Sequence, residues 1–255
     1  MYYDYALAAP VMAGLSNREA GSVLVLGNGT GTFAHQCTTY FPNLQVEGVE
    51  IDDRITDLAY AYFDMSDEVQ VTTYDGRAYL QAVDSTYDVI QVDAYQDITI
   101  PFQMSSTEFF TLVREHLNPG GVMVVNLNMH SDGEGSINQA LCDTIASVFP
   151  YVCTVDVPGT TNRELFAAVD GDPIQWLKAN RADITDGERL PPNGPVDAEP
   201  DGLHPRGPLF SPTTRPGGKL LGMGAIGPAI IQAPAGGTIK EIFREEGLSG
   251  LLSRF

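Results

Sequence analysis

The first 170 residues alternate between short apolar runs and longer segments in which apolar residues recur every three or four positions. The apolar runs predict strands, and the segments between them predict helices. We expect strands at residues 23–27, 46–50, 69–73, 87–92, 121–127, 151–156 and 163–169. We expect helices at residues 31–41, 53–63, 76–83, 105–117 and 135–148.

Strands that alternate with helices predict a parallel sheet with helices on both faces. The first strands are nearly continuous apolar runs, as a sheet buried on both faces requires. The last two strands are joined by "VPGTTN", residues 157–162, with no helix between them, which predicts an antiparallel hairpin at one edge. The fold class is therefore α/β: a Rossmann-like, doubly wound, mostly parallel seven-stranded sheet with an antiparallel edge hairpin and an irregular C-terminal tail.

The composition changes after Asp170 and divides the chain into three parts. We expect one domain at residues 1–170, a docking helix at 171–184 and a Pro/Gly-rich tail at 185–255. Ten of the 17 prolines fall within residues 191–234, and that stretch has no apolar period, which is typical of irregular chain. The end of the tail, residues 238–254, could form a terminal helix.

The charge balance and the cysteines restrict the partners and the compartment. The chain has 33 acidic and 14 basic residues, a net charge of −19, so we expect no nucleic-acid partner. Its three cysteines, Cys37, Cys142 and Cys153, show no metal-ligand spacing, and we expect buried thiols in a reducing compartment, the cytoplasm. The N-terminus lacks the basic start of a signal peptide, and no apolar run is long enough to predict a membrane span.

A glycine-rich loop follows the first strand in "VLVLGNGTGTFA", residues 23–34. Glycine tolerates positive φ and lets another group approach the backbone closely. A helix that starts directly after such a loop presents free N–H groups, which suits a nucleotide or nucleoside ligand. The alternative is a tight strand–helix turn without a ligand. The predicted loop residues are Gly27, Asn28, Gly29 and Gly31.

The next three predicted strands each end in a carboxylate, at Glu50, Asp75 and Asp93. Ligands of open α/β sheets bind beyond the carboxyl ends of the strands. Glu50, about twenty residues beyond the loop, can accept both hydroxyls of a ribose. Asp75 could accept a hydrogen bond from an exocyclic amine such as that of adenine, or could instead cap the following helix. Asp93 lies on the other side of the loop, where the reacting end of the ligand is expected.

Neighbours of these carboxylates complete the predicted site. Asp52 and Gly76 extend the cofactor-binding set, and Tyr95 and Asp97 extend the catalytic set around Asp93. No histidine–carboxylate spacing indicates a metal. Thr32 stands at the sixth position of the glycine loop, where a dinucleotide-binding loop requires a small residue, and this disfavours a nicotinamide cofactor.

This constellation resembles the class I S-adenosylmethionine-dependent methyltransferase fold, through "GNGTG" at 27–31 and "LNPGG" at 117–121. Within that fold, residues 1–170 more closely resemble the spermidine synthase family, the polyamine aminopropyltransferases. The motifs that carry this resemblance are "VEGVEID", "VTTYDGRAYL" and "YDVIQVDAYQDITIPFQMSSTEFF". The resemblance implies transfer of an aminopropyl group from decarboxylated S-adenosylmethionine to a polyamine.

Three departures from the family pattern keep other functions open. Thr30 replaces the loop aspartate, Gln96 replaces the second acid of D-x-x-D, with Asp97 one place later, and only about twenty residues precede the first strand where the family has a β-hairpin domain. Intact S-adenosylmethionine is therefore an alternative co-substrate, which would make the protein a methyltransferase. A non-catalytic nucleoside-binding domain is the third hypothesis. The sequence leaves the amine acceptor and the oligomeric state open, with a homodimer as one assembly to test.

Overall fold

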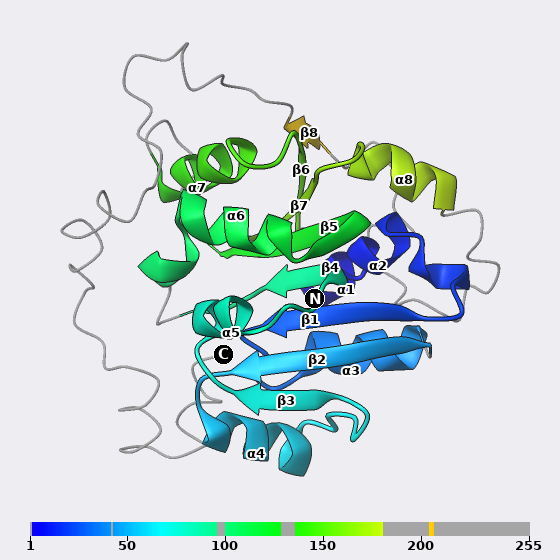
Figure 1. Ribbon diagram of the computed structural model, residues 1–255, viewed down its shortest axis with the longest axis vertical. Helices are drawn as coiled ribbons and strands as arrows, with labels where there is room; N and C mark the ends of the chain where they lie inside the picture. Colours follow the sequence, from blue (N-terminus) through cyan, green and yellow to red (C-terminus); the bar gives the residue numbers. More distant parts are fainter. Residues whose placement is uncertain (1, 42, 96–99, 129–135, 181–203, 207–255) are drawn as a thin grey trace.

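Apolar segments of the chain build a single sheet in the computed structural model, which describes residues 2–41, 43–95, 100–128, 136–180 and 204–206. The sheet has eight strands in the order β3-β2-β1-β4-β5-β7-β6-β8 (Figure 1). Strands β3 to β5 in this order are parallel, and β7, β6 and β8 are antiparallel to their neighbours. The strands are β1 Gly21–Leu26, β2 Leu44–Glu50, β3 Gln70–Thr73, β4 Tyr87–Val92, β5 Leu117–Asn128, β6 Tyr151–Asp156, β7 Asn162–Ala168 and β8 His204–Arg206.

Helices cover both faces of the sheet because both faces of its central strands are apolar. In β1, Val23 and Val25 enter one core, and Leu24 and Leu26 enter the other. The first core is closed by α1 Tyr2–Ala6, α2 Ala8–Met12, α3 Thr32–Tyr40, α4 Asp53–Tyr62 and α8 Pro173–Asn180. The second core is closed by α5 Gly76–Ala82, α6 Thr107–Glu115 and α7 Ile137–Ala146. Two short 3₁₀ turns, η1 Leu15–Asn17 and η2 Phe102–Met104, complete the elements.

The parallel strands bring the residues of the predicted site to one edge of the sheet. Strands β1 to β4 all point to the left in Figure 1, so their carboxyl ends meet there. The strand order reverses between β1 and β4, and the glycine loop after β1 lies at that point.

The structure departs from the predicted elements in three places. The seven predicted strands are confirmed, but the sheet has an eighth, because His204–Arg206 pairs antiparallel with β6 inside the tail predicted to be irregular. This pairing satisfies the backbone groups of an otherwise open edge. Helices α1 and α2 were not predicted. The strand expected at 121–127 begins earlier, because "LNPGG" at 117–121 opens β5, where Leu117 already pairs with Tyr87 before an irregularity in the register.

The predicted docking helix corresponds to α8, which packs against α2, β6 and β7. The division of the chain at 170 and 184 stays a prediction. The terminal helix expected at 238–254 and most of the tail lie outside the described residues.

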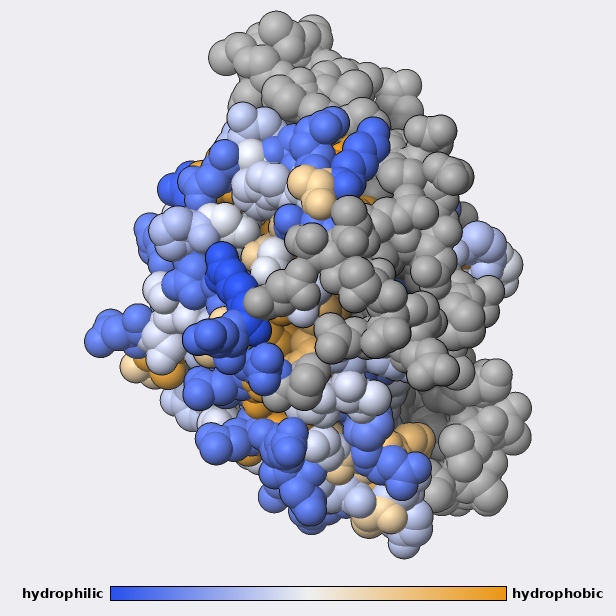
Figure 2. Space-filling view, turned by 90° about the vertical axis from the view of Figure 1, so that its right-hand side faces the viewer, coloured by the Kyte–Doolittle hydropathy of each residue, from blue (hydrophilic) through white to orange (hydrophobic). Residues whose placement is uncertain are grey.

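The surface agrees with the strongly acidic composition. The face shown in Figure 2 is predominantly hydrophilic where its residues are described. Among the described helices, none combines the length and the apolar character needed to cross a bilayer.

Candidate active site at the carboxyl ends of the strands

The glycine loop folds back against the ends of two neighbouring strands. Gly27 has a φ of 84° and donates its N–H to the carbonyl oxygen of Val49 over 2.9 Å. A Cβ on Gly27 would lie 2.6 Å from the Cα of Ala94, so the close approach of the two backbones requires glycine. Gly29 and Gly31 also have positive φ, and a Cβ on Gly29 would meet no atom within 4 Å. The loop is thus packed on its inner side and open at Gly29.

Asn28 is buried within the loop and retains an unused acceptor. Its Nδ2 donates to Sδ of Met65 over 3.3 Å, whereas its Oδ1 has no hydrogen-bond partner among the described residues. Only 6% of Asn28 is exposed. Buried polar atoms without a hydrogen-bond partner are rare in proteins, and a functional role is one explanation for those that occur.

Glu50, at the end of β2, ties the loop to that strand. Its Oε2 accepts from the N–H of Gly29 over 2.8 Å, and its Oε1 accepts from the N–H groups of Ile51 and Asp52 over 2.9 and 3.2 Å. A carboxylate can accept about four hydrogen bonds, so Oε2 retains capacity for a ligand hydroxyl. The structure therefore brings Glu50 and the loop together, and its role with a ribose stays a prediction.

Asp52 and Asp75 both act as helix N-caps. Asp52 accepts from the N–H of Arg54 and forms an ion pair with its guanidinium over 2.7 Å. Asp75 accepts from the N–H of Ala78 over 2.9 Å, and Gly76 begins α5 directly after it. The capping role considered for Asp75 is thus observed. Its contact with an adenine amine stays a prediction.

Asp93 follows β4 and lies beneath α1. Its Oδ2 accepts from the hydroxyl of Tyr2 over 2.9 Å, and its Oδ1 accepts from Nδ2 of Asn126 over 3.1 Å. Burial raises the pKa of Asp93 to about 6, while the hydrogen bonds from Asn126 and Tyr2 act in the opposite direction. Asp93 is therefore a carboxylate whose proton affinity lies close to neutral pH, as a general base requires.

Tyr95 joins the turn after β4 to the end of β5. Its hydroxyl donates to the carbonyl oxygen of Asn126 and accepts from the N–H of Asn128 over 2.8 Å. Burial raises the pKa of Tyr95, so the hydroxyl stays protonated at neutral pH. Tyr95 thereby fixes the backbone beside Asp93. Asp97, the third predicted catalytic residue, lies outside the described residues.

Sequence reasoning missed Glu164, a further carboxylate at this edge of the sheet. Glu164 lies on β7 opposite Asn126, is fully buried, and neither of its oxygens has a hydrogen-bond partner in the described part of the chain. Burial, reinforced by the charge of Asp93, raises its pKa. The available signal was a glutamate directly before the apolar run "LFAAV", residues 165–169, inside a predicted strand.

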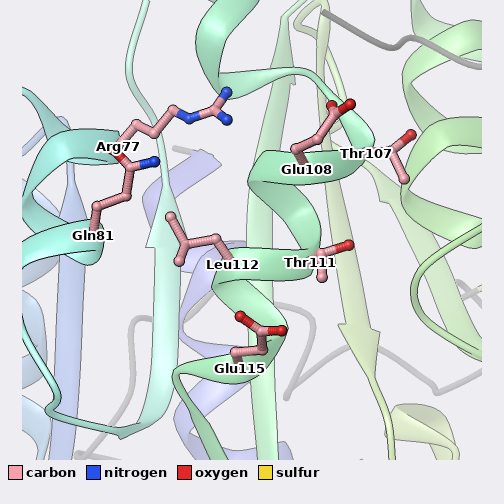
Figure 3. A pocket seen from close by; sticks show the side chains of 7 residues that line it. All are labelled: Arg77, Gln81, Thr107, Glu108, Thr111, Leu112 and Glu115. Carbon is pink, nitrogen blue, oxygen red and sulfur yellow. The ribbon is translucent and has the colours of Figure 1, made fainter.

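A surface hollow lies elsewhere, between α5 and α6 (Figure 3). It has a volume of about 360 Å³, and Figure 3 shows Arg77 and Gln81 of α5 facing the side chains of α6. The predicted strand-end residues are not among the seven that line it: Arg77, Gln81, Thr107, Glu108, Thr111, Leu112 and Glu115. We therefore do not place the reaction in this hollow.

Comparison with known proteins identifies relatives of this chain. Residues 5–169 match the spermine/spermidine synthase domain. The chain is 66% identical over 173 residues to the "Probable polyamine aminopropyl transferase" of Bifidobacterium longum, a match that covers 67% of this chain and 38% of that protein. The chain thus spans well under half the length of this relative.

Two solved structures share the fold. Human methyltransferase-like protein 13, in complex with SAH, superposes with a TM-score of 0.61 at 22% identity, covering 70% of this chain and 91% of that one. A probable spermidine synthase from Corynebacterium glutamicum superposes with a TM-score of 0.60 at 21% identity, covering 73% and 71%. Both confirm the predicted methyltransferase-like sheet.

Proposed function

Because the chain belongs to the spermine/spermidine synthase family, we propose that it transfers an aminopropyl group from decarboxylated S-adenosylmethionine to a polyamine. The observation that carries this proposal is Asp93, a partly buried carboxylate at the end of β4 beside the glycine loop, with its pKa raised to about 6. The predicted cytoplasmic location and the homodimer stay predictions.

The chemistry requires a base at this position. The amine nitrogen of the acceptor forms a bond to the carbon next to the sulfonium of the donor, the carbon–sulfur bond breaks, and its electron pair stays on sulfur as a neutral thioether. The attacking amine must be neutral, and deprotonating a lysine-like ammonium at pH 7 costs roughly 4.6 kcal/mol. Asp93 can hold the ammonium as its counter-ion and accept the proton that the nitrogen loses.

The donor's nucleoside end fits the other half of the site. The loop is open at Gly29, Asn28 retains a buried acceptor, and Glu50 retains capacity at Oε2. We assign the ribose to Glu50 and the adenine base to Asp75. Asp52 caps α4 two residues after Glu50, and Gly76 begins α5 directly after Asp75. The donor's aminopropyl end would then point toward Asp93, across the loop.

Thr30 favours methyl transfer from intact S-adenosylmethionine as a second candidate. A neutral loop residue tolerates the carboxylate of the intact cofactor, which an aspartate at this position would repel. The two candidates differ in the donor they accept and in the group that they transfer, so one assay separates them.

The test is to incubate the full chain with putrescine or spermidine and each donor between pH 7 and 10, and to identify products by mass spectrometry. We expect aminopropylated products with the decarboxylated donor alone. A methylated product with the intact donor would favour the second candidate. Absence of both products across this range would refute the proposed function.

A further inference from the structure

Three polar side chains form a row across the ends of β4, β5 and β7, on the face of the sheet that α1 covers. Side chains alternate between the two faces along a strand, so Asn126 lies on the same face as Val124, and Glu164 on the same face as Phe166. Both of these apolar residues enter the core that α1 closes. Asp93 joins the row through its hydrogen bond with Asn126, which therefore stands between the two carboxyl groups.

Asn126 uses only one side of its amide. Its Nδ2 donates to Oδ1 of Asp93 over 3.1 Å, whereas its own Oδ1 has no hydrogen-bond partner among the described residues. The residue is 2% exposed, so this oxygen is shielded from bulk water. Glu164 stands directly opposite Asn126 in the β5–β7 pairing, where side chains start about 5 Å apart. Because the NH₂ group is used toward β4, the amide oxygen is the atom left for Glu164.

Glu164 also lacks a partner for its polar atoms. It is 0% exposed, and neither of its oxygens accepts a hydrogen bond within the described part of the chain. The neighbouring cation, Arg163, lies on the opposite face by the alternation of the strand and pairs with Asp156. An ionised carboxylate that is buried without a cation or a donor is costly, and such a group takes up a proton instead.

The surroundings of Glu164 favour the neutral acid. Burial raises the pKa of Glu164, and the negative charge of Asp93 raises it further. Within the described residues, the groups that pair with Glu164 or act on it from neighbouring elements carry no positive charge: Asn126 on β5, Val155 on β6, Tyr3 on α1, and Asp93 and Tyr95 after β4. A proton on Glu164 therefore removes its repulsion with Asp93 and breaks no ion pair in this part of the chain.

We propose that Glu164 is held as a neutral carboxylic acid whose O–H donates to Oδ1 of Asn126, and that it thereby orients the NH₂ group of Asn126 toward Asp93. One proton then provides a partner for two buried atoms that otherwise have none, the amide oxygen and one carboxyl oxygen. Turning the amide would exchange the roles of the two acids, since Nδ2 would donate to Glu164 and the amide oxygen would need a proton on Asp93. The amide is thus matched to one proton shared by the two acids.

Glu164 is in this reading a positioning residue, which acts on the reaction through Asn126. The hydrogen bond from Asn126 lowers the pKa of Asp93, and a neutral Glu164 adds no negative charge that would raise it. Asp93 therefore stays ionised at neutral pH, as a base for the ammonium group of the acceptor must be. This consequence rests on the proposed function, whereas the proton on Glu164 does not.

The kinetic test compares Glu164→Leu with Glu164→Gln. Leucine suits a buried strand and leaves Oδ1 of Asn126 without a donor. Glutamine has the shape of the neutral acid, and its NH₂ group can donate to the same oxygen. We expect Glu164→Leu to lower kcat about 10-fold at pH 7 and to move the acid limb of the pH profile upward, with KM for putrescine changed less than about threefold. Glu164→Gln should restore both kcat and the profile.

Two measurements detect the proton without turnover. The infrared spectrum of the full chain at pH 8 should contain the C=O band of a neutral carboxylic acid, and Glu164→Gln should lack this band. In urea-induced unfolding, the stability advantage of Glu164→Gln over wild type should grow at least about tenfold, as an equilibrium constant, from pH 5 to pH 8. The reason is that the raised pKa of Glu164 makes wild type lose stability as pH rises above the ordinary value of 4.5.

Glu47→Gln is the matched control, because Glu47 on β2 accepts from the hydroxyls of Tyr79 and Tyr87. This variant should lower stability at both pH values and keep the infrared band. Absence of the band from wild type, or an unchanged pH profile in Glu164→Leu, would overturn the role of Glu164. Equal loss of kcat in Glu164→Gln and Glu164→Leu would overturn it as well, by showing that an ionised carboxylate is required. The expected band and pH dependence without any aminopropyl transfer would refute the proposed function alone.

Discussion

Replacing Asp93 by asparagine should stabilise the protein at alkaline pH and strongly reduce the proposed aminopropyl transfer. The substitution keeps the size of the side chain and removes its charge. Tyr2 can still donate to the amide oxygen of the new residue. Asn126 can turn its amide, because its Oδ1 has no partner among the described residues and can accept from the new NH₂ group. The hydrogen bonds therefore change less than the charge does.

The expected change in the free energy of unfolding follows from the raised pKa of Asp93. A pKa of about 6 in the folded protein, against 3.8 in the unfolded chain, corresponds to about 3 kcal/mol, since each tenfold change in proton affinity is worth about 1.36 kcal/mol. Because the folded-state pKa is raised, the unfolded chain releases its proton first, and wild-type stability falls as pH rises from 3.8 to 6. The variant does not lose stability in this way. Its weaker hydrogen bonds reduce the resulting stability gain by about 1 kcal/mol.

The assay is urea-induced unfolding of both proteins at pH 5 and pH 8, both above the pI of about 4.3 where the protein is least soluble. Roughly half of the destabilisation of wild type has developed at pH 5, so the stability advantage of the variant should grow by about 1.4 kcal/mol between the two pH values. Aminopropyl transfer by the variant should fall about 10²–10⁴-fold at pH 7, and the deficit should shrink toward pH 10 as free amine accumulates.

The two readouts test one cause, the charge of Asp93 in a partly buried site. A variant that is less stable than wild type by the same amount at both pH values would show that Asp93 serves as a structural hydrogen-bond acceptor. Loss of methylthioadenosine affinity together with stability would lead to the same conclusion. Either result would refute the reasoning.

Further predictions concern the loop, the tyrosine and the tail. Glu50→Ala removes the acceptor of the Gly29 N–H and should weaken methylthioadenosine binding at least tenfold, measured by calorimetry against a melting curve that shows a folded variant. Gly27→Ala should destabilise the protein by about 2 kcal/mol or more in urea, because its Cβ would strike Ala94 at positive φ. Tyr95→Phe should cost about 0.5–1.5 kcal/mol in urea-induced unfolding by removing the hydroxyl's hydrogen bonds to the backbone of Asn126 and Asn128. Truncation after residue 182 should preserve a cooperative thermal transition, and aggregation of the shortened chain would show that the tail belongs to the core.

Hydrophobic periodicity predicted the elements that are long enough to show a full period, and it failed for the short ones. Most of the seven predicted strands were predictable because they are apolar runs bounded by helices or turns. Helix α1 has five residues, α2 has five and contains Pro10, and β8 has three, so none of them offers a full period. Their positions depend on contacts with β5, β6 and β7 that only the folded chain provides.

The candidate site was predictable to the same extent. The positions of Glu50, Asp75 and Asp93 follow from the strands that precede them, because parallel strands end at one edge of the sheet. The partners of Asp93 do not follow, since Tyr2 is 91 residues away and Asn126 is 33 residues away. The raised pKa of Asp93 depends on burial under α1, an element that the pattern did not contain.

Glu164 illustrates where the pattern should have been questioned. Strand β7 lies between β5 and β6, and its residues 164–168 are all buried, so every one of these positions favours an apolar side chain. A glutamate there lowers stability unless a ligand or a proton compensates it, and the chain supplies no described partner. Residues that violate a local rule without a structural compensation tend to lie at functional sites. The single charged residue in the buried part of β7 is therefore better evidence for a functional site than the apolar residues that made the strand predictable.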